Sequence, residues 1–301
     1  MFKSLTKGDK YGHYGYIFII PFFIVMSLFI IYPIIQTMSL SLTEWDGSII
    51  PPKFVGLQNY MELVKDPLFY KSVANTWIIW IANIIPQMLF GLGLAVLLTD
   101  RKMKGKEFFR AVYYLPNLIT MASIGALVYF MFDWKSGSVN KILMGLNIIK
   151  EEFYWFQDIT ASRLIVSFTS WWMWFGYTMI IFMAGIKAIP EDLYEAAHVD
   201  GASKWQVFWN ITLPLLKPIM LYQIVTSVIG GLSMYDIPYV VSSGTGAPQD
   251  SLTTMVMYVY GTAFRNFHYG YGSAIGVGLF IHIIIVVAIA FKFVNPKNVY
   301  N

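Results

Sequence analysis

The sequence has no cysteine and few charged residues. The absence of cysteine excludes disulfide bonds, thiolate nucleophiles and thiolate metal ligands. Only 13% of the 301 residues are Asp, Glu, Lys or Arg, whereas a soluble globular chain carries about 25%. Hydrophobic residues make up 57% of the chain, and its mean hydropathy is +0.57. This composition predicts a protein embedded in a lipid bilayer.

Other absences narrow the class of function. No basic run is interleaved with aromatic residues, so nucleic acid is not an expected partner. The four histidines, His13, His198, His268 and His282, are scattered along the chain and do not suggest a metal cluster. No G-x-x-x-x-G-K-[ST] loop is present to hold nucleotide phosphates. We therefore expect no catalytic, metal or cofactor site in this chain.

Six apolar stretches are long enough to cross a membrane, which takes roughly 20 residues each. They lie near 15–40, 73–99, 111–132, 164–186, 214–235 and 271–291. The first is too long for the apolar region of a signal peptide, and no small-x-small cleavage site follows it. We expect an all-α, polytopic membrane protein in which residues 1–301 form a single transmembrane domain with six helices.

The distribution of basic residues predicts the orientation. The two terminal tails, the segment 100–110 and the segment 187–217 hold 13 of the 21 lysines and arginines. The longer segments 41–72, 133–163 and 236–270 hold the other 8. Because lysine and arginine are enriched in cytoplasmic loops, we expect both termini and the segment 187–213 to face the cytoplasm.

The predicted spans are nearly free of charged groups. Lys217, near one end of a span, is the exception. Transporters driven by ions usually carry ionisable residues within their spans, and here only His282 lies deep in one. His282 is either a neutral ring bonded to a neighbouring helix or part of a proton relay, for which no partner is evident. Uphill transport would therefore need energy from outside the membrane domain.

Uncharged polar and aromatic residues lie near the middle of several spans. The candidate substrate path consists of Asn83, Gln87, Trp172, Tyr177, Gln223 and Ser227. Amides exchange hydrogen bonds with hydroxyls, and aromatic rings stack on the apolar faces of sugars. This set suits a neutral, hydroxyl-rich ligand. The same residue types also hold membrane helices together, so both interpretations stay open.

A polar segment, 190–213, separates two of the apolar stretches. Pro190 favours a helix start, and Gly201 interrupts the helix where either a left-handed or a tightly packed backbone is needed. Ala196 and Ala197 give the first helix a small apolar face that another protein's backbone can approach closely. We expect two short helices joined at Gly201. These helices either dock onto another protein or lie on the membrane surface.

The residues of this segment resemble a known signature. Glu195-Ala196-Ala197, Gly201, Ile211, Leu213 and Pro214 match the pattern E-A-A-x3-G-x9-I-x-L-P. The pattern is similar to that of the inner-membrane permease subunits of binding-protein-dependent ABC importers. "FVGLQNY" (54–60), "RAVYYLPNLI" (110–119) and "LTTMVMYVYGTAF" (252–264) resemble the carbohydrate-uptake branch, of the maltose-permease first-subunit type. The resemblance runs from about Gly15 to Phe293.

The resemblance implies a type I ABC importer permease fold in a bacterial inner (plasma) membrane. Glu195, Ala196, Ala197, Asp200 and Gly201 would belong to a coupling helix seated in a groove of a cytoplasmic ATPase subunit. The implied partners are a second permease subunit, two ATPase subunits that bind ATP and Mg²⁺, an extracytoplasmic sugar-binding protein and membrane lipid. No cofactor is implied in this chain.

Two other classes of function are alternatives to a sugar importer. A stand-alone secondary transporter or channel for a neutral polar solute would work without an ATPase. A membrane-bound enzyme would need a nucleophile or metal constellation, which the sequence does not suggest. The many aromatic residues lean towards an oligosaccharide among sugars, because several rings need several stacking surfaces.

Overall fold

The computed structural model describes residues 12–100 and 103–293, and these residues are mostly helical. By their internal contacts they form two compact units. The first comprises the described parts of Met1–Lys65 and Gly261–Val277, and the second those of Asp66–Tyr260 and Gly278–Asn301. The all-α prediction is confirmed. The single transmembrane domain expected over residues 1–301 stays a prediction.

The first unit begins with a long apolar helix. It consists of α1 (Gly12–Met26), a π-helical turn η1 (Ser27–Ile31) and α2 (Tyr32–Leu40). Its candidate membrane span, Gly15–Leu40, has the predicted bounds. Pro33 lies two residues beyond the π-helical turn. The wider turn eases the clash of the proline ring with the carbonyl four residues earlier.

A small hairpin and a short helix follow in the first unit. Strand β1 (Thr43–Glu44) pairs antiparallel with β2 (Lys53–Phe54), and α3 (Gln58–Leu63) follows them. The buried Asn59 side chain donates hydrogen bonds of 2.9 Å to the carbonyl oxygens of Ser41 and Thr43. The π-helical turn η4 (Gly261–Arg265) and the start of α15 (Tyr269–Phe293) complete this unit.

The second unit is built on three long helices, α4 (Pro67–Thr99), α8 (Ile159–Lys187) and α12 (Lys217–Leu232). Helices α4 and α8 pack against each other more extensively than any other pair. Both begin several residues before the predicted spans because an aspartate caps each one. Asp66 accepts from the backbone N–H of Leu68 at 2.8 Å, and Asp158 accepts from that of Ala161 at 2.7 Å.

The segment predicted as one helix over 111–132 is instead two helices at 90° to each other. Helix α5 (Lys106–Tyr114) runs into a 3₁₀ turn, η2 (Leu115–Leu118), and α6 (Met121–Met131) follows. Ile119 between them is extended, and the Thr120 hydroxyl caps α6 by accepting from the Ser123 N–H at 3.3 Å. Five described helices are long and apolar enough to span a membrane, or six if this bent pair counts as one span.

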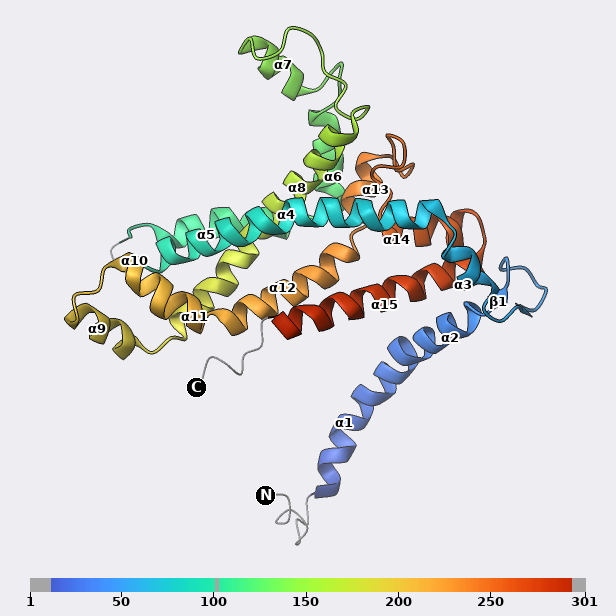
Figure 1. Cartoon of the computed structure of the whole chain (residues 1–301), viewed down its shortest axis with the longest axis horizontal. Coiled ribbons are helices and arrows are strands. Elements are labelled where there is room, and N and C mark those ends of the chain that lie inside the picture. The colour runs from blue at the N-terminus through green and yellow to red at the C-terminus, as the bar shows by residue number, and fades with distance from the viewer. Residues whose placement is uncertain (1–11, 101–102, 294–301) are drawn as a thin grey trace. The chain divides into compact units, whose positions relative to one another are not determined.

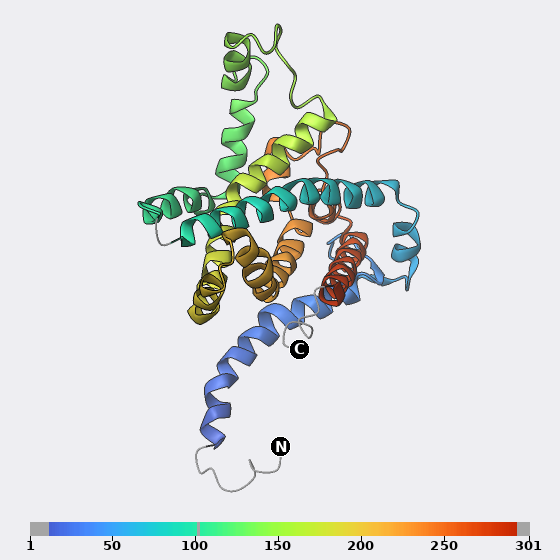
Figure 2. The same cartoon turned by 60° about the vertical axis from the view of Figure 1, so that its left-hand side comes forward.

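Shorter helices lie at the two ends of the long ones. They are α7 (Ser138–Gly145), α9 (Glu191–Val199), α10 (Lys204–Val207), η3 (Phe208–Thr212), α11 (Leu213–Leu215), α13 (Asp236–Val241) and α14 (Met255–Tyr260). Helices α9 and α10 lie at the end where α4 finishes and α12 begins, and α13 and α14 lie towards the other end (Figure 1). Helix α7 lies beyond the end of α6 (Figure 2).

Candidate coupling segment and polar helix interior

The segment 190–213 has the predicted two-helix form. Helix α9 starts after Pro190 and ends in a Schellman motif. The Ala202 N–H bonds the Ala197 carbonyl at 2.9 Å, and the Gly201 N–H bonds the His198 carbonyl at 3.1 Å. Gly201 has φ +76° and open space around its Cβ position, so of the two expected conditions the left-handed backbone holds and tight packing does not.

The residues predicted to contact an ATPase form an uncovered surface on α9 and the turn after it. Glu195, Ala196 and Asp200 are exposed, and Ala197 is half-buried. Among the described residues, neither the Glu195 nor the Asp200 carboxylate forms an ion pair. Val199 is 87% exposed. The surface therefore has both charged and apolar groups without a covering partner in this chain.

A few contacts fasten this segment to the helix ends. The hydroxyls of Tyr194 and Thr212 are 3.2 Å apart, and Lys204 Nζ lies 2.8 Å from Asp100 Oδ2. A capping box starts α10, in which Ser203 and Gln206 each accept a hydrogen bond from the other's backbone N–H. The second helix continues from α10 through the π-helical turn η3, which ends two residues before Pro214, into α11.

Two of the predicted path residues meet on a third residue that sequence reasoning missed. The amide nitrogens of Gln87 and Gln223 donate to the Thr178 hydroxyl oxygen at 2.7 and 2.9 Å. All three side chains are buried where α4, α8 and α12 meet. The sequence signal for Thr178 is a polar residue in an apolar run, but a single sequence does not reveal which helices face each other.

The other path residues lie apart from this cluster. Ser227 accepts a hydrogen bond of 3.1 Å from the Trp80 indole, and Tyr177 meets the Trp174 ring edge-on at 5.8 Å. Trp172 packs, partly buried, against a hydrophobic cluster. Asn83 is buried, and its side-chain oxygen has no hydrogen-bond partner among the described residues. Helix-to-helix hydrogen bonds account for Gln87, Ser227 and the amide nitrogen of Gln223. The Gln223 side-chain oxygen, like that of Asn83, is buried without a partner among the described residues. The substrate path stays a prediction.

His282 has a hydrogen-bond partner on a neighbouring helix. Its Nε2 accepts from the Trp77 indole N–H at 2.8 Å. An indole nitrogen only donates, so this ring nitrogen must be unprotonated. The contact confirms the hydrogen-bonded interpretation of His282.

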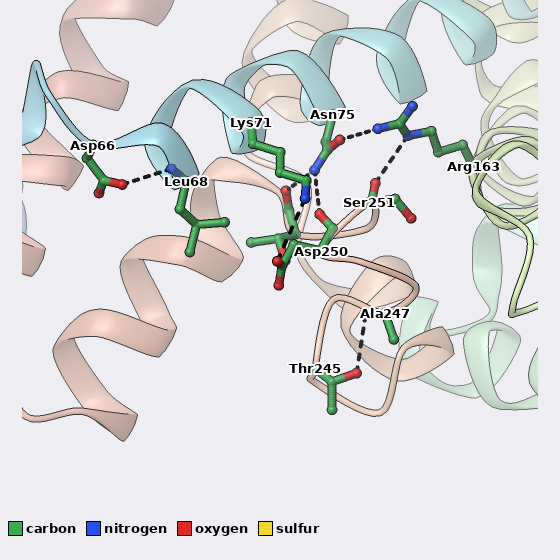
Figure 3. Close-up of polar contacts among 10 residues, drawn as sticks. Asp66, Leu68, Lys71, Asn75, Arg163, Thr245, Ala247, Asp250 and Ser251 are labelled. Atoms are coloured by element: carbon green, nitrogen blue, oxygen red, sulfur yellow. Dashed lines mark hydrogen bonds and ion pairs between the residues drawn. The ribbon is translucent and has the colours of Figure 1, made fainter.

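The end of the second unit opposite α9 carries a polar network that sequence reasoning did not find (Figure 3). The buried Asn75 amide donates to the carbonyl oxygens of Asp250 and Thr253 at 2.7 and 3.0 Å. Arg163 donates to Asn75 Oδ1 at 2.5 Å and to the Ser251 carbonyl at 3.3 Å. These bonds fasten the loop before α14 to both α4 and α8.

Comparison with known proteins agrees with this architecture. Residues 87–299 match the family described as "Binding-protein-dependent transport system inner membrane component". The lactose transport system permease protein LacF of Rhizobium radiobacter is 33% identical over 251 residues, covering 83% of each chain. The arabinooligosaccharides transport system permease protein AraP of Bacillus subtilis is 31% identical over 260 residues, covering 85% of this chain and 80% of AraP.

A solved structure shares the fold. In a bacterial alginate ABC transporter in complex with alginate pentasaccharide-bound periplasmic protein, one chain superposes with a TM-score of 0.81. It is 21% identical, and the match covers 95% of this chain and 96% of that one. The type I importer permease fold expected from the sequence is thereby confirmed.

Proposed function

Because the chain belongs to the family of inner membrane components of binding-protein-dependent transport systems, we propose that it carries a sugar inward as one of two permease subunits of an ABC importer. As a member of this family, the chain is a membrane permease component of a transport system and not an enzyme. The proposal adds the substrate, the partner chains and the coupling site.

The uncovered surface of α9 and the Gly201 turn carries the coupling part of the proposal. A segment that transmits motion must be stiff and must touch its partner closely. The Schellman motif and the capping box stabilise the two helices, while Glu195, Ala196 and Asp200 remain exposed. Glu195 is available to pair with a basic group of an ATPase subunit. That subunit would bind ATP and Mg²⁺, and this chain would bind neither.

The sugar part of the proposal rests on chemistry and on relatives. LacF and AraP are named for the transport of lactose and of arabinooligosaccharides. The amides of Asn83, Gln87 and Gln223 could exchange hydrogen bonds with sugar hydroxyls once the helices separate. Asn83 already has an unpaired buried oxygen within the described residues. An extracytoplasmic binding protein would deliver the sugar, which we propose to be an oligosaccharide.

Uptake by the reconstituted transporter tests the coupling site. Gly201→Val places a β-branched residue at φ +76°, where it is strained, while Gly201→Asn is the matched control because asparagine tolerates this conformation. We expect Gly201→Val to insert in the membrane but to lose ATP-driven uptake, and Gly201→Asn to retain most of it. Equal uptake by the two variants contradicts the assignment. Uptake without any ATPase would instead favour a stand-alone transporter.

The absence of native cysteine allows a direct test of orientation. Ile49 and His198 are exposed positions in segments predicted to lie on opposite sides of the membrane. We propose that an impermeant maleimide labels Ile49→Cys in intact cells and labels His198→Cys only after the membrane is opened. The reverse pattern would place the α9 surface outside, where no ATPase could reach it.

A further inference from the structure

The first unit contains a cavity that none of the roles above uses. Its volume is about 420 Å³, and it lies between the hairpin, α3 and residues 266–271. Small-ligand sites typically measure about 300–1,000 Å³. Two segments far apart in the sequence form its walls.

Close backbone contacts hold these two segments together. Gly47 (φ +81°) packs against the Tyr269 ring, and any side chain at Gly270 would overlap the Thr43 carbonyl oxygen. The Gly270 N–H also donates to the Trp45 carbonyl at 3.3 Å. The cavity is therefore shaped before any ligand arrives, which reduces the entropy cost of binding.

The cavity wall carries an excess of negative charge. Glu44, Asp46 and Glu62 line it, with Lys53 as the one lysine or arginine among its lining residues. Lys53 Nζ lies 3.7 Å from Glu44 Oε2. Asp46 and Glu62 thus have no lysine or arginine partner among the described residues. Hydrogen bonds from Ser48 lower the pKa of Asp46, and the charge of His268, which also lines the cavity, acts in the same direction.

The negative charge favours a cationic ligand. The aromatic and apolar residues of the other walls suit the uncharged part of a long cationic side chain. Trp45 and Tyr271 offer aromatic faces, and a guanidinium group near such a face is attracted by the ring. Ile50 and Val55 offer apolar surface for the methylene groups of the chain. A neutral sugar could stack here but would bring no positive charge to Asp46 and Glu62, which have only His268 as a further titratable base in the lining. A guanidinium group compensates them and can bond a carboxylate through two N–H groups.

We propose that this acidic pocket receives an arginine side chain of the extracytoplasmic binding protein. The inference rests on the proposed function, since it needs a binding-protein partner and the segment 41–72 outside the cell. The arginine inserts between the aromatic and aliphatic walls, and Asp46 and Glu62 hold its guanidinium group. The pocket thereby fixes where the binding protein docks on this subunit.

Docking affinity tests the pocket in the complete transporter. The complex, in lipid nanodiscs, is titrated with its own binding protein at several salt concentrations. The double variant Asp46→Asn, Glu62→Gln removes both charges and nearly keeps the shapes. We expect its Kd to rise about tenfold or more and its salt dependence to flatten. The control, Glu151→Gln with Glu152→Gln, removes two exposed carboxylates from another predicted outer loop and should leave Kd unchanged.

Reversing the charge of Glu62 gives a second measurement, which tests for restored binding as well as for lost binding. Glu62→Arg should weaken docking further, and an arginine-to-glutamate change on the binding protein should restore it. An unchanged Kd in the double variant, or an equal loss in the control, overturns the pocket assignment. Unchanged docking with weaker sugar uptake also overturns it and makes the cavity a sugar subsite. If the unaltered transporter binds no binding protein at all, the proposed function fails with it.

Discussion

Polar side chains are buried and bonded to one another where α4, α8 and α12 meet, whereas in the segment 190–213 they are mostly exposed. Burying an amide in an apolar interior is unfavourable unless it is hydrogen-bonded. In the interior around Thr178, the amide nitrogens of Gln87 and Gln223 are hydrogen-bonded within the chain. On the α9 surface the Glu195 and Asp200 carboxylates form no ion pair among the described residues, as expected of a surface that another protein covers.

Two glycines show the same difference between the packed helix interior and the exposed segment 190–213. Gly176 in α8 needs the absence of a side chain, because a Cβ atom there would overlap the Tyr113 carbonyl. Gly201 has open space around it and instead needs its backbone angle, φ +76°. The first residue therefore serves packing, and the second serves the shape of an exposed turn.

The largest loss of stability is expected at Gly176. Gly176→Ala forces α8 away from the Tyr113 backbone, and we expect overpacking to cost about 3 kcal/mol of unfolding free energy. Gly93→Ala is the matched control, since Gly93 lies in α4 with nothing near its Cβ position; it should be neutral or stabilise by up to about 1 kcal/mol. Thermal unfolding in detergent measures both. Equal midpoints for the two variants would contradict the close approach.

A smaller loss is expected at Thr178. Thr178→Val keeps the shape but removes the acceptor of two buried amide N–H groups. We expect a loss of about 1–2 kcal/mol, since a buried donor without a partner costs about 1–3 kcal/mol and hydrogen bonds within membranes average about 0.6 kcal/mol. Thr178→Ser keeps the hydroxyl and should lose less. A loss in Thr178→Ser would report the methyl contact with Gly91, which valine keeps. An unchanged midpoint for Thr178→Val would contradict a stabilising role of the two hydrogen bonds.

The smallest effect is expected in the segment 190–213 itself. Lys204 forms its ion pair with Asp100 while 89% of the lysine side chain is exposed. Exposed pairs contribute about 0–1 kcal/mol, so Lys204→Gln should leave the unfolding midpoint nearly unchanged. A loss as large as that of Thr178→Val would show that this segment depends on internal contacts, and the contrast between the two regions would disappear.

Local features were predictable from the sequence. Pro190 and Gly201 marked the start and end of α9. Proline restricts its backbone angle φ and glycine allows positive φ, and neither effect depends on distant residues. Long apolar runs revealed five spans. The 90° bend between η2 and α6 was missed, although Pro116 was a local signal for it, because the apolar composition continues through the bend.

Features that depend on two distant segments were not predictable. Thr178 gains its importance from Gln87 and Gln223, which lie on other helices. The acidic cavity needs residues near Asp46 and near His268 to come together. Composition and periodicity carry no information on such pairings, so the sequence suggested polar residues in the spans without showing which of them bond.

Cross-linking from Val199 tests the central claim most directly, because this side chain is 87% exposed on the α9 surface. A photo-reactive amino acid replaces Val199 in the complete transporter in membranes, and the products are identified by mass spectrometry. We predict a covalent product with the ATPase subunit. Products with lipid alone, in a preparation where the ATPase is present and active, would contradict the assignment of α9 and Gly201 as the coupling site.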